Sequence, residues 1–393
     1  MEVVNTIWIV VQVFIGYNLV LPIFLYILWK LKKPVVYAVE KTRDEIDYAI
    51  IVTAYQQTNQ LPVVVQSLLR LNYSNYIIYI VADHCDTSDL YFEDKRVIIL
   101  TPPEILSSNT RSHFYGINNF IRPHERLTII DSDNLVDPEY LNQLNPYFNN
   151  GFQAVQGIRK AKNLDTTYAC LDAARDLYYH FYDGKVLFEL NSSATLSGSG
   201  MAFTTRLYKA CLGHLDITGA GFDKVLQAAI VGKDLRIAFA DQAIVYDEKT
   251  SQSNQLVNQR ARWINTWFKY FKFGFEIIGK GIKNSSMNQF LFGLILLRPP
   301  LFMFILLSGL FLLLNIFSSG IGFISWLIAF LLFITGFYLA LRKSNADPKI
   351  YKSLKGIPQF IFLQLISLAK SKNANKTSVA TTHYHKYEDK TES

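Results

Sequence analysis

Three long apolar runs constrain this chain more than any other feature. Residues 7–29 carry no charge, and residues 301–317 and 321–341 are nearly as apolar. Each is long enough to cross a bilayer as a helix. Lysines cluster at residues 30–33, and Arg342 and Lys343 follow the last run. Since basic residues favour the cytosolic side, we predict a multi-pass protein of the cell (inner or plasma) membrane, with its N-terminus outside.

The apolar runs divide the sequence into predicted parts. We expect a transmembrane anchor (1–33), a cytosolic domain (34–265), interfacial helices (266–297), two transmembrane helices (298–342), and a cytosolic interfacial helix with a basic tail (343–393).

The net charge of +7 comes almost entirely from residues 342–393, which contain ten Lys/Arg and four Asp/Glu. A basic segment beside a membrane helix binds anionic membrane lipids. Because the middle of the chain has no basic, aromatic-interleaved face, nucleic acid is excluded as a partner.

The middle of the chain alternates between strand and helix patterns. Buried strands are predicted at 48–55, 76–82, 96–100 and 127–130, with helices at 61–71 and 111–121, and further strands at 152–158 and 194–204. This order predicts an α/β fold with a doubly wound, mostly parallel sheet. Ligands of such sheets bind beyond the carboxyl ends of the strands. Neither a Gly-rich dinucleotide fingerprint nor a phosphate-binding P-loop is present, so phosphates need another counter-charge.

Polar residues stand at the ends of the predicted strands. Tyr55 ends the first, Asp83 the second, and Asp131-Ser132-Asp133 the fourth. Asp-Ser-Asp-Asn is also a good turn sequence, and Asp86 competes with Asp83 for any role at that edge. The location at strand ends favours a ligand site.

A second pair of motifs lies further on. Asp223 follows Gly221-Phe222, and Gln259-Arg260-Ala261-Arg262-Trp263 begins after 35 intervening residues. Taken alone, Asp223 could simply complement a helix dipole, and the Arg-Trp segment could be an interfacial helix.

Four elements follow one another in a fixed order: Asp83, Asp131-Ser132-Asp133, Asp223 and the Gln-Arg-x-Arg-Trp segment. In this order they resemble the membrane-bound, processive-type family-2 glycosyltransferases, which include cellulose, chitin and hyaluronan synthases. The resemblance covers roughly positions 48–270 and implies a GT-A-like fold and an inverting, metal-dependent hexosyltransferase. It also implies a nucleotide-sugar donor, with a UDP-sugar expected, and Mg²⁺ or Mn²⁺ as cofactor.

The resemblance assigns roles residue by residue. Asp223 becomes the catalytic base. Tyr55, Asp83, Arg111, Asp131 and Asp133 become nucleotide or donor residues, and Asp131 and Asp133 also hold the metal. Gln259, Arg262 and Trp263 become acceptor and diphosphate residues. The chain departs from the family pattern at Phe222, where relatives carry an acidic residue, and before Arg111, where relatives often carry a lysine.

Three functions stay open from the sequence. The product is a growing polysaccharide or a lipid-linked glycan. The alternatives are addition of one sugar to a lipid carrier, or an inactive membrane scaffold of the same fold. Three apolar spans cannot enclose a hydrated polymer, so export would need a partner or a homo-oligomer.

Overall fold

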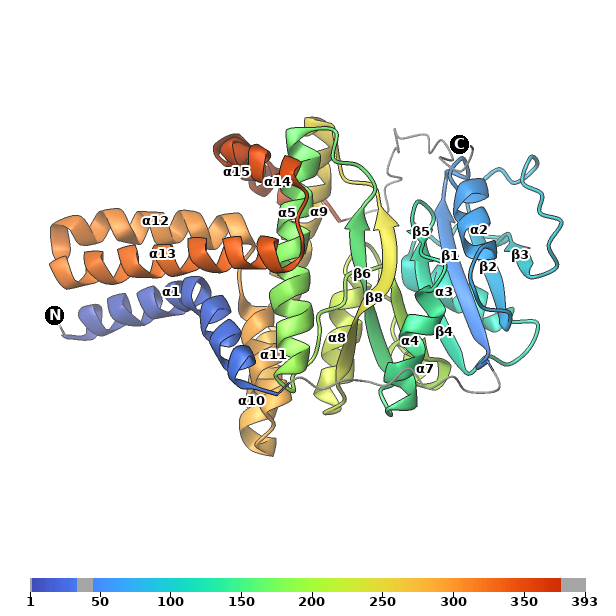
Figure 1. Cartoon of the computed structure of the whole chain (residues 1–393), viewed down its shortest axis with the longest axis horizontal. Coiled ribbons are helices and arrows are strands. Elements are labelled where there is room, and N and C mark those ends of the chain that lie inside the picture. The colour runs from blue at the N-terminus through green and yellow to red at the C-terminus, as the bar shows by residue number, and fades with distance from the viewer. Residues whose placement is uncertain (1, 34–44, 376–393) are drawn as a thin grey trace.

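The computed structural model describes residues 2–33 and 45–375. Figure 1 shows an α/β domain from which several apolar helices extend on one side. The predicted basic tail beyond residue 375 lies outside the described residues.

The domain is built on one eight-stranded sheet in the order β3-β2-β1-β4-β7-β6-β8-β5. The strands are β1 Tyr48–Tyr55, β2 Tyr76–Asp83, β3 Val97–Leu100, β4 Arg126–Asp131, β5 Leu135–Val136, β6 Ala154–Ala161, β7 Met201–Thr204 and β8 Ile237–Asp247. Strands β1 to β4 pair in parallel, as do β6 and β8, while β7 and β5 pair antiparallel with their neighbours. The predicted α/β class, with a mixed and mostly parallel sheet, is confirmed.

The strand register brings the predicted strand-end residues to one edge. Tyr55 pairs with Asp83, and Thr53, two residues earlier, pairs with Asp131. Strand β6 runs in the same direction as β4, because each is antiparallel to β7. The carboxyl end of β8 therefore brings Asp247 to this edge as well.

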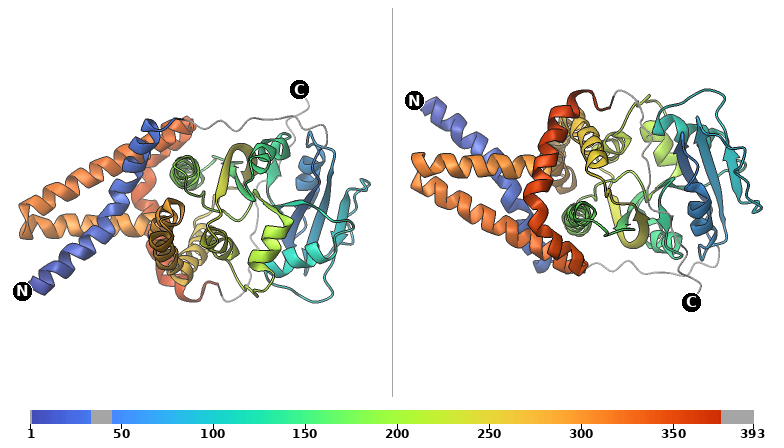
Figure 2. Two further views of the ribbon diagram at one scale, coloured as in Figure 1. Left: turned by 90° about the horizontal axis from the view of Figure 1, so that it is seen from below. Right: turned by 90° about the horizontal axis from the view of Figure 1, so that it is seen from above.

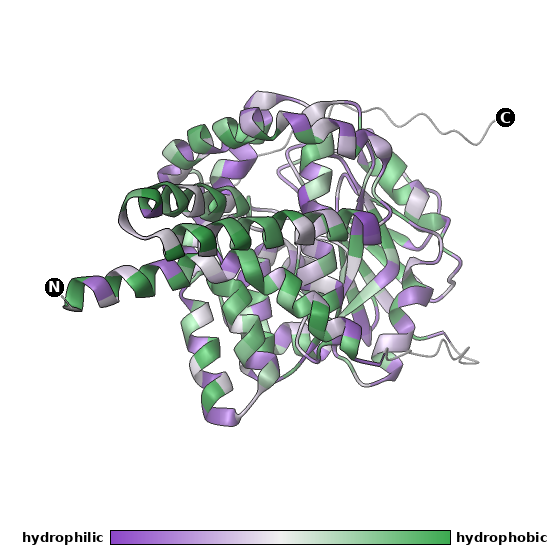
Figure 3. Ribbon diagram, turned by 60° about the vertical axis from the view of Figure 1, so that its left-hand side comes forward, coloured by the Kyte–Doolittle hydropathy of each residue, from purple (hydrophilic) through white to green (hydrophobic). Residues whose placement is uncertain are grey.

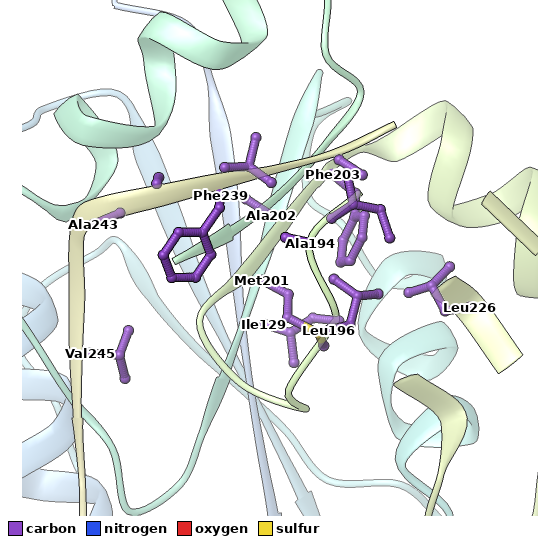
Figure 4. Close-up of a cluster of buried hydrophobic side chains, with 14 of the residues drawn as sticks. Ile129, Ala194, Leu196, Met201, Ala202, Phe203, Leu226, Phe239, Ala243 and Val245 are labelled. Carbon is purple, nitrogen blue, oxygen red and sulfur yellow. The ribbon is translucent and has the colours of Figure 1, made fainter. Parts of the chain in front are cut away.

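Helices pack on the sheet and close its core. Those of the domain are α2 Leu61–Leu69, α3 Asn109–Asn118, α4 Tyr140–Asn149, α5 Thr167–Tyr179, the π-helix η1 His180–Val186, α6 Leu187–Glu189, α7 Thr205–Leu212, α8 Phe222–Gly232 and α9 Ser253–Tyr270. Figure 4 shows part of the core, where Leu226 of α8 faces Met201 and Phe203 of β7. These three side chains are at most 1% exposed, so α8 is fixed to the sheet by apolar burial.

Within residues 2–33 and 45–375, three helices are long and apolar enough to cross a membrane: α1 Glu2–Leu31, α12 Leu301–Ser318 and α13 Gly320–Lys343. They pack on one another and leave the domain on one side (Figure 2). Helix α1 contains Pro22 and is bent in Figure 1, as expected where proline removes a helix hydrogen bond. Polar side chains in this bundle pair between helices, since Gln12 Oε1 accepts from Asn315 Nδ2 at 2.7 Å and Trp326 Nε1 at 2.8 Å.

The remaining helices connect the apolar bundle to the domain. They are α10 Phe273–Asn284, α11 Met287–Leu297, α14 Pro348–Ser353, the 3-10 helices η2 Leu354–Gly356 and η3 Ser371–Asn373, and α15 Ile357–Lys370. Helices α10 and α11 pack on each other and on α8, whereas α15 packs on α9 and α5. Figure 2 shows α15 crossing near the base of α12 and α13.

Two local expectations differ from the structure. The strand expected at residues 194–204 is confined to Met201–Thr204, because Gly198 and Gly200 adopt positive φ angles of 91° and 66° and keep the preceding segment a loop. The helical stretch from α5 through α6 was not predicted at all.

Candidate active site

A large cavity of about 860 Å³ lies beyond the carboxyl ends of the strands. It is lined by seven of the nine predicted site residues: Tyr55, Asp131, Asp133, Asp223, Gln259, Arg262 and Trp263. The two motif regions, separated by about a hundred residues in the sequence, therefore face one space.

The Asp131–Asp133 segment is held by a neighbouring loop. The backbone N–H of Asp131 donates to Ser199 Oγ at 3.0 Å, and Lys162 Nζ donates to the backbone oxygen of Asp133. Burial lowers the pKa of Lys162, which stays close to these carboxylates. Among the described residues no group of three or more His, Cys, Asp or Glu side chains could hold a metal. The pair fits an ion such as Mg²⁺ that is bound by one or two carboxylates together with substrate phosphates.

Asp223 lies in the first turn of α8, against helix α9. Its carboxylate pairs with Lys224 Nζ at 3.1 Å, and the Lys224 ammonium also donates to the Leu196 oxygen at 3.2 Å. The preceding Gly221 adopts φ 106°, and a Cβ at this position would lie 2.6 Å from side-chain atoms of Thr266 and Tyr270. The beginning of α8 is thus in close contact with α9, which carries the Gln-Arg-x-Arg-Trp motif.

This contact gives a prediction for Gly221→Ala. The new methyl group meets α9 in a backbone conformation that costs L-residues about 1–3 kcal/mol, so we expect a lower Tm and reduced activity. Gly151→Ala is the matched control, because Gly151 also has a positive φ (86°) but a methyl group there would have no neighbour within 4 Å. Thermal unfolding of both variants checks this, and an equal loss of Tm would show that α9 contact contributes nothing.

The three predicted site residues on α9, Gln259, Arg262 and Trp263, line the cavity but make different contacts. Gln259 Oε1 accepts from Thr250 Oγ1 at 3.2 Å. Burial lowers the pKa of the Arg262 guanidinium. Trp263 lies under two cations, with the guanidinium carbons of Arg260 and Arg175 at 4.2 and 4.4 Å from its ring centroid. In this structure the indole is therefore a cation–π partner as well as an apolar surface in the cavity.

Trp263 lies beside a buried ionic network that was not predicted from the sequence. Its members all line the cavity and comprise three carboxylates and four cations: Asp172, Asp176, Asp247, Arg159, Arg175, Lys249 and Arg260. Removing one partner of such a buried pair typically costs ~3–5 kcal/mol. One positive charge is in excess.

Burial and the neighbouring charges act in opposite directions on the carboxyls of this network, and burial raises the pKa values of Asp172 and Asp247. Burial opposes ionisation of Asp176, but Lys249, Arg175 and Arg159 outweigh it and keep the pKa of this carboxyl well below its ordinary value. Burial likewise opposes the charge of Lys249, yet the neighbouring Asp176 and Asp247 raise its pKa. The network therefore places cationic side chains in the same cavity lining as Asp131 and Asp133.

The sequence signal for this network is ambiguous. Asp172, Arg175 and Asp176 recur at helical spacing within a segment otherwise rich in apolar residues. Such a pattern normally indicates a solvated helix face. Here the face is covered by α9 and β8, which no local pattern indicates.

Two predicted donor residues do not line the cavity. Asp83 is 1% exposed, and its two carboxylate oxygens accept the backbone N–H groups of Leu106 and Ser107 at 2.9 and 2.8 Å. Ser107 Oγ in turn contacts Tyr55 Oη at 3.2 Å. Arg111 pairs with Asp216 at 2.6 Å on the surface. Asp83 thus supports the loop beside Tyr55, and direct donor contacts of both residues stay predictions.

The sheet order and the position of the cavity define the class of protein: an α/β protein with the GT-A-like fold. Residues 46–266 match the model of the glycosyltransferase-like family 2. Because this match covers more than half of the chain, the protein belongs to that family and is a family-2 glycosyltransferase.

The solved structure of a mannosyltransferase supports this fold. A mannosyltransferase from Pyrobaculum calidifontis, in complex with GDP-Man and Mn²⁺, is 14% identical with a TM-score of 0.60, covering 92% of this chain and 97% of its own. Residues 1–349 of TarS from S. aureus, in complex with UDP-GlcNAc, are 12% identical with a TM-score of 0.44, covering 84% and 90%. No curated protein sequence matches this chain.

Proposed function

We propose that this protein is an inverting glycosyltransferase of the cell membrane. It moves a sugar from a nucleotide sugar, with a UDP-sugar the expected donor, to a growing polysaccharide or a lipid-linked glycan at the cytosolic face. The observation that carries the proposal is the shared cavity that collects Asp131, Asp133, Asp223, Arg262 and Trp263.

Each residue has a role that its position allows. Asp223 accepts the proton of the acceptor hydroxyl, which then attacks the sugar in line, so one base suffices and the anomeric configuration inverts. Arg262 and the buried network stabilise the negative charge of the leaving diphosphate. Asp131 and Asp133 would hold Mg²⁺ or Mn²⁺, which neutralises diphosphate charge when bound. The mannosyltransferase relative solved with GDP-Man and Mn²⁺ supports this cofactor.

The direct test is nucleotide release by the purified protein from a panel of nucleotide sugars with Mn²⁺. Release that depends on both metal and acceptor is expected for at least one donor. Product length then separates a processive synthase from addition of one sugar. A protein that binds no nucleotide sugar in the panel would instead fit the inactive scaffold.

The proposed orientation makes a separate prediction. The turn after α12 should lie outside the cell, and the segment after α15 in the cytosol. In intact cells a membrane-impermeant maleimide should label Phe317→Cys, which replaces a side chain 91% exposed, and not Lys372→Cys, also on the surface. Both should react after permeabilisation, and the reverse pattern in intact cells would invert the topology.

A further inference from the structure

The cavity continues past the catalytic groups into an apolar part. Beyond Trp263 and Arg298 its lining comes from α12, α13 and α15 and includes Phe302, Ile305, Ile334, Phe337, Ile357 and Phe360. We call this region the apolar part of the cavity. Two of these helices, α12 and α13, are candidate membrane spans.

The apolar part is bounded by specific contacts with the domain. The ring of Phe337 on α13 stacks on Tyr178 of α5 with centroids 5.6 Å apart. Close by, Tyr182 Oη donates to the backbone oxygen of Gly336 at 2.9 Å. On the other side Phe360 of α15 lies 6.0 Å from the Arg260 guanidinium. Helices α13 and α15 are therefore each fixed to the domain, with the cavity between them.

The cavity opens sideways between these helices. Ile334 and Tyr338 of α13 line it and yet are 59% and 53% exposed, and Ile357 at the beginning of α15 is 37% exposed. Figure 3 shows that the apolar helices consist mainly of hydrophobic residues. Tyr338 stands one helical turn before Arg342, the basic end of the span. The opening thus lies where the hydrocarbon core of a bilayer would meet its headgroups.

Polar groups mark the boundary between the two parts. Arg298, directly before the Pro299-Pro300 pair that precedes α12, is 7% exposed and forms a buried ion pair with Asp183 of η1. It also lies 5.2 Å from the ring of Tyr179. On one side of Arg298 the cavity is charged, and on the other it is lined by hydrocarbon and aromatic rings.

This division matches an amphiphile better than a glycan chain. Sugar hydroxyls transferred into the apolar part would lose hydrogen bonds to water without replacement, whereas a hydrocarbon tail gains from burial there. A general base at Asp223 is useful to a hydroxyl nucleophile, since a phosphate oxygen is already ionised. The head must therefore present a hydroxyl to the charged part.

We propose that the acceptor is a membrane lipid with a hydroxyl-bearing head, whose hydrocarbon tail enters between α13 and α15 and occupies the apolar part of the cavity. The head reaches past Arg298 to Asp223. This inference rests on the proposed function, and it selects the lipid-linked acceptor over a free polysaccharide.

Photolabelling tests the tail site without requiring turnover. The probe is a dodecyl glucoside with a diazirine at the end of its tail, added to the full-length protein in phosphatidylcholine vesicles. We expect crosslinks at Phe302, which is 2% exposed and lines the cavity, so bulk lipid does not reach it. Unlabelled dodecyl glucoside should compete, and methyl glucoside, which has the same head and no tail, should not.

A bulky residue at the opening gives the matched comparison. Ile334→Trp should reduce labelling of Phe302 and transfer to lipid acceptors by about tenfold or more. Ile328→Trp is the control, because Ile328 is 52% exposed on the same helix and does not line the cavity. Both positions tolerate a large side chain, since each faces outward.

The outcomes separate this inference from the proposed function. Binding of UDP or GDP with Mn²⁺, measured by calorimetry, reports the donor site in each variant and should not change. If nucleotide binds but crosslinks fall only on outward residues such as Leu313, the proposed lipid site is wrong. It is also wrong if Phe302 is labelled to the same extent in Ile334→Trp and Ile328→Trp. If Phe302 is labelled and no nucleotide binds, the lipid site stands and the proposed transferase function fails.

Discussion

Asp223→Asn is expected to lower turnover by about 10²–10⁴-fold, the usual contribution of a general base. The amide keeps the shape of the side chain and removes the proton acceptor. Because the base acts on the acceptor and not on the nucleotide, donor affinity should be nearly unchanged. The measurement is kcat alongside the Kd of the donor nucleotide.

The control for this variant is Asp241→Asn, which breaks a half-exposed ion pair with Lys185 and lies outside the cavity. It should retain turnover, since such surface pairs contribute ~0–1 kcal/mol. If donor affinity in Asp223→Asn falls as far as turnover, Asp223 is a binding residue and another group must take the proton.

Asp133→Asn is expected to reduce metal-dependent turnover by at least about 100-fold. A bound ion stabilises transition-state charge by several kcal/mol, and each ~1.4 kcal/mol is a factor of ten in rate. The loss should appear as a weaker response to added Mn²⁺, while the unfolding temperature stays near that of the unmodified protein.

Asp137→Asn is the comparison for the metal site. Asp137 lies four residues further on, does not line the cavity, and accepts the backbone N–H of Glu139 at 3.0 Å. It should leave the Mn²⁺ response unchanged. Full activity in Asp133→Asn, with metal still required, would move the metal site away from this segment.

Local sequence patterns were sufficient to predict which residues lie at the carboxyl edge of the sheet. The short, apolar, β-branched run at residues 48–55 favours a buried strand, and in a parallel sheet its carboxyl end lies beside those of its neighbours. Asp131 and Tyr55 could therefore be assigned to one edge before the register of β1 and β4 was known. The three candidate membrane helices were equally predictable, because length and lack of charge suffice to identify them.

Contacts between distant segments were not predictable in this way. The loop that engages Asp83 includes Ser107 at φ 47°, a conformation that local sequence does not specify. The pairing of Arg111 with Asp216, 105 residues away, was likewise not predictable, and the donor role of Arg111 stays a prediction.

The sequence by itself determined strands β1 to β4, the apolar spans, and the residue types able to hold a metal, remove a proton and bind phosphate. These follow from local periodicity and side-chain chemistry. Only the tertiary structure decided that Asp172 is a buried partner of Arg260, 88 residues away, and that the charged cavity continues into an apolar part between α13 and α15. Burial of a charge and the enclosure of a cavity depend on which segments pack together. A periodic sequence pattern predicts which face of a helix or strand is apolar or polar, but it does not predict which other segment covers that face.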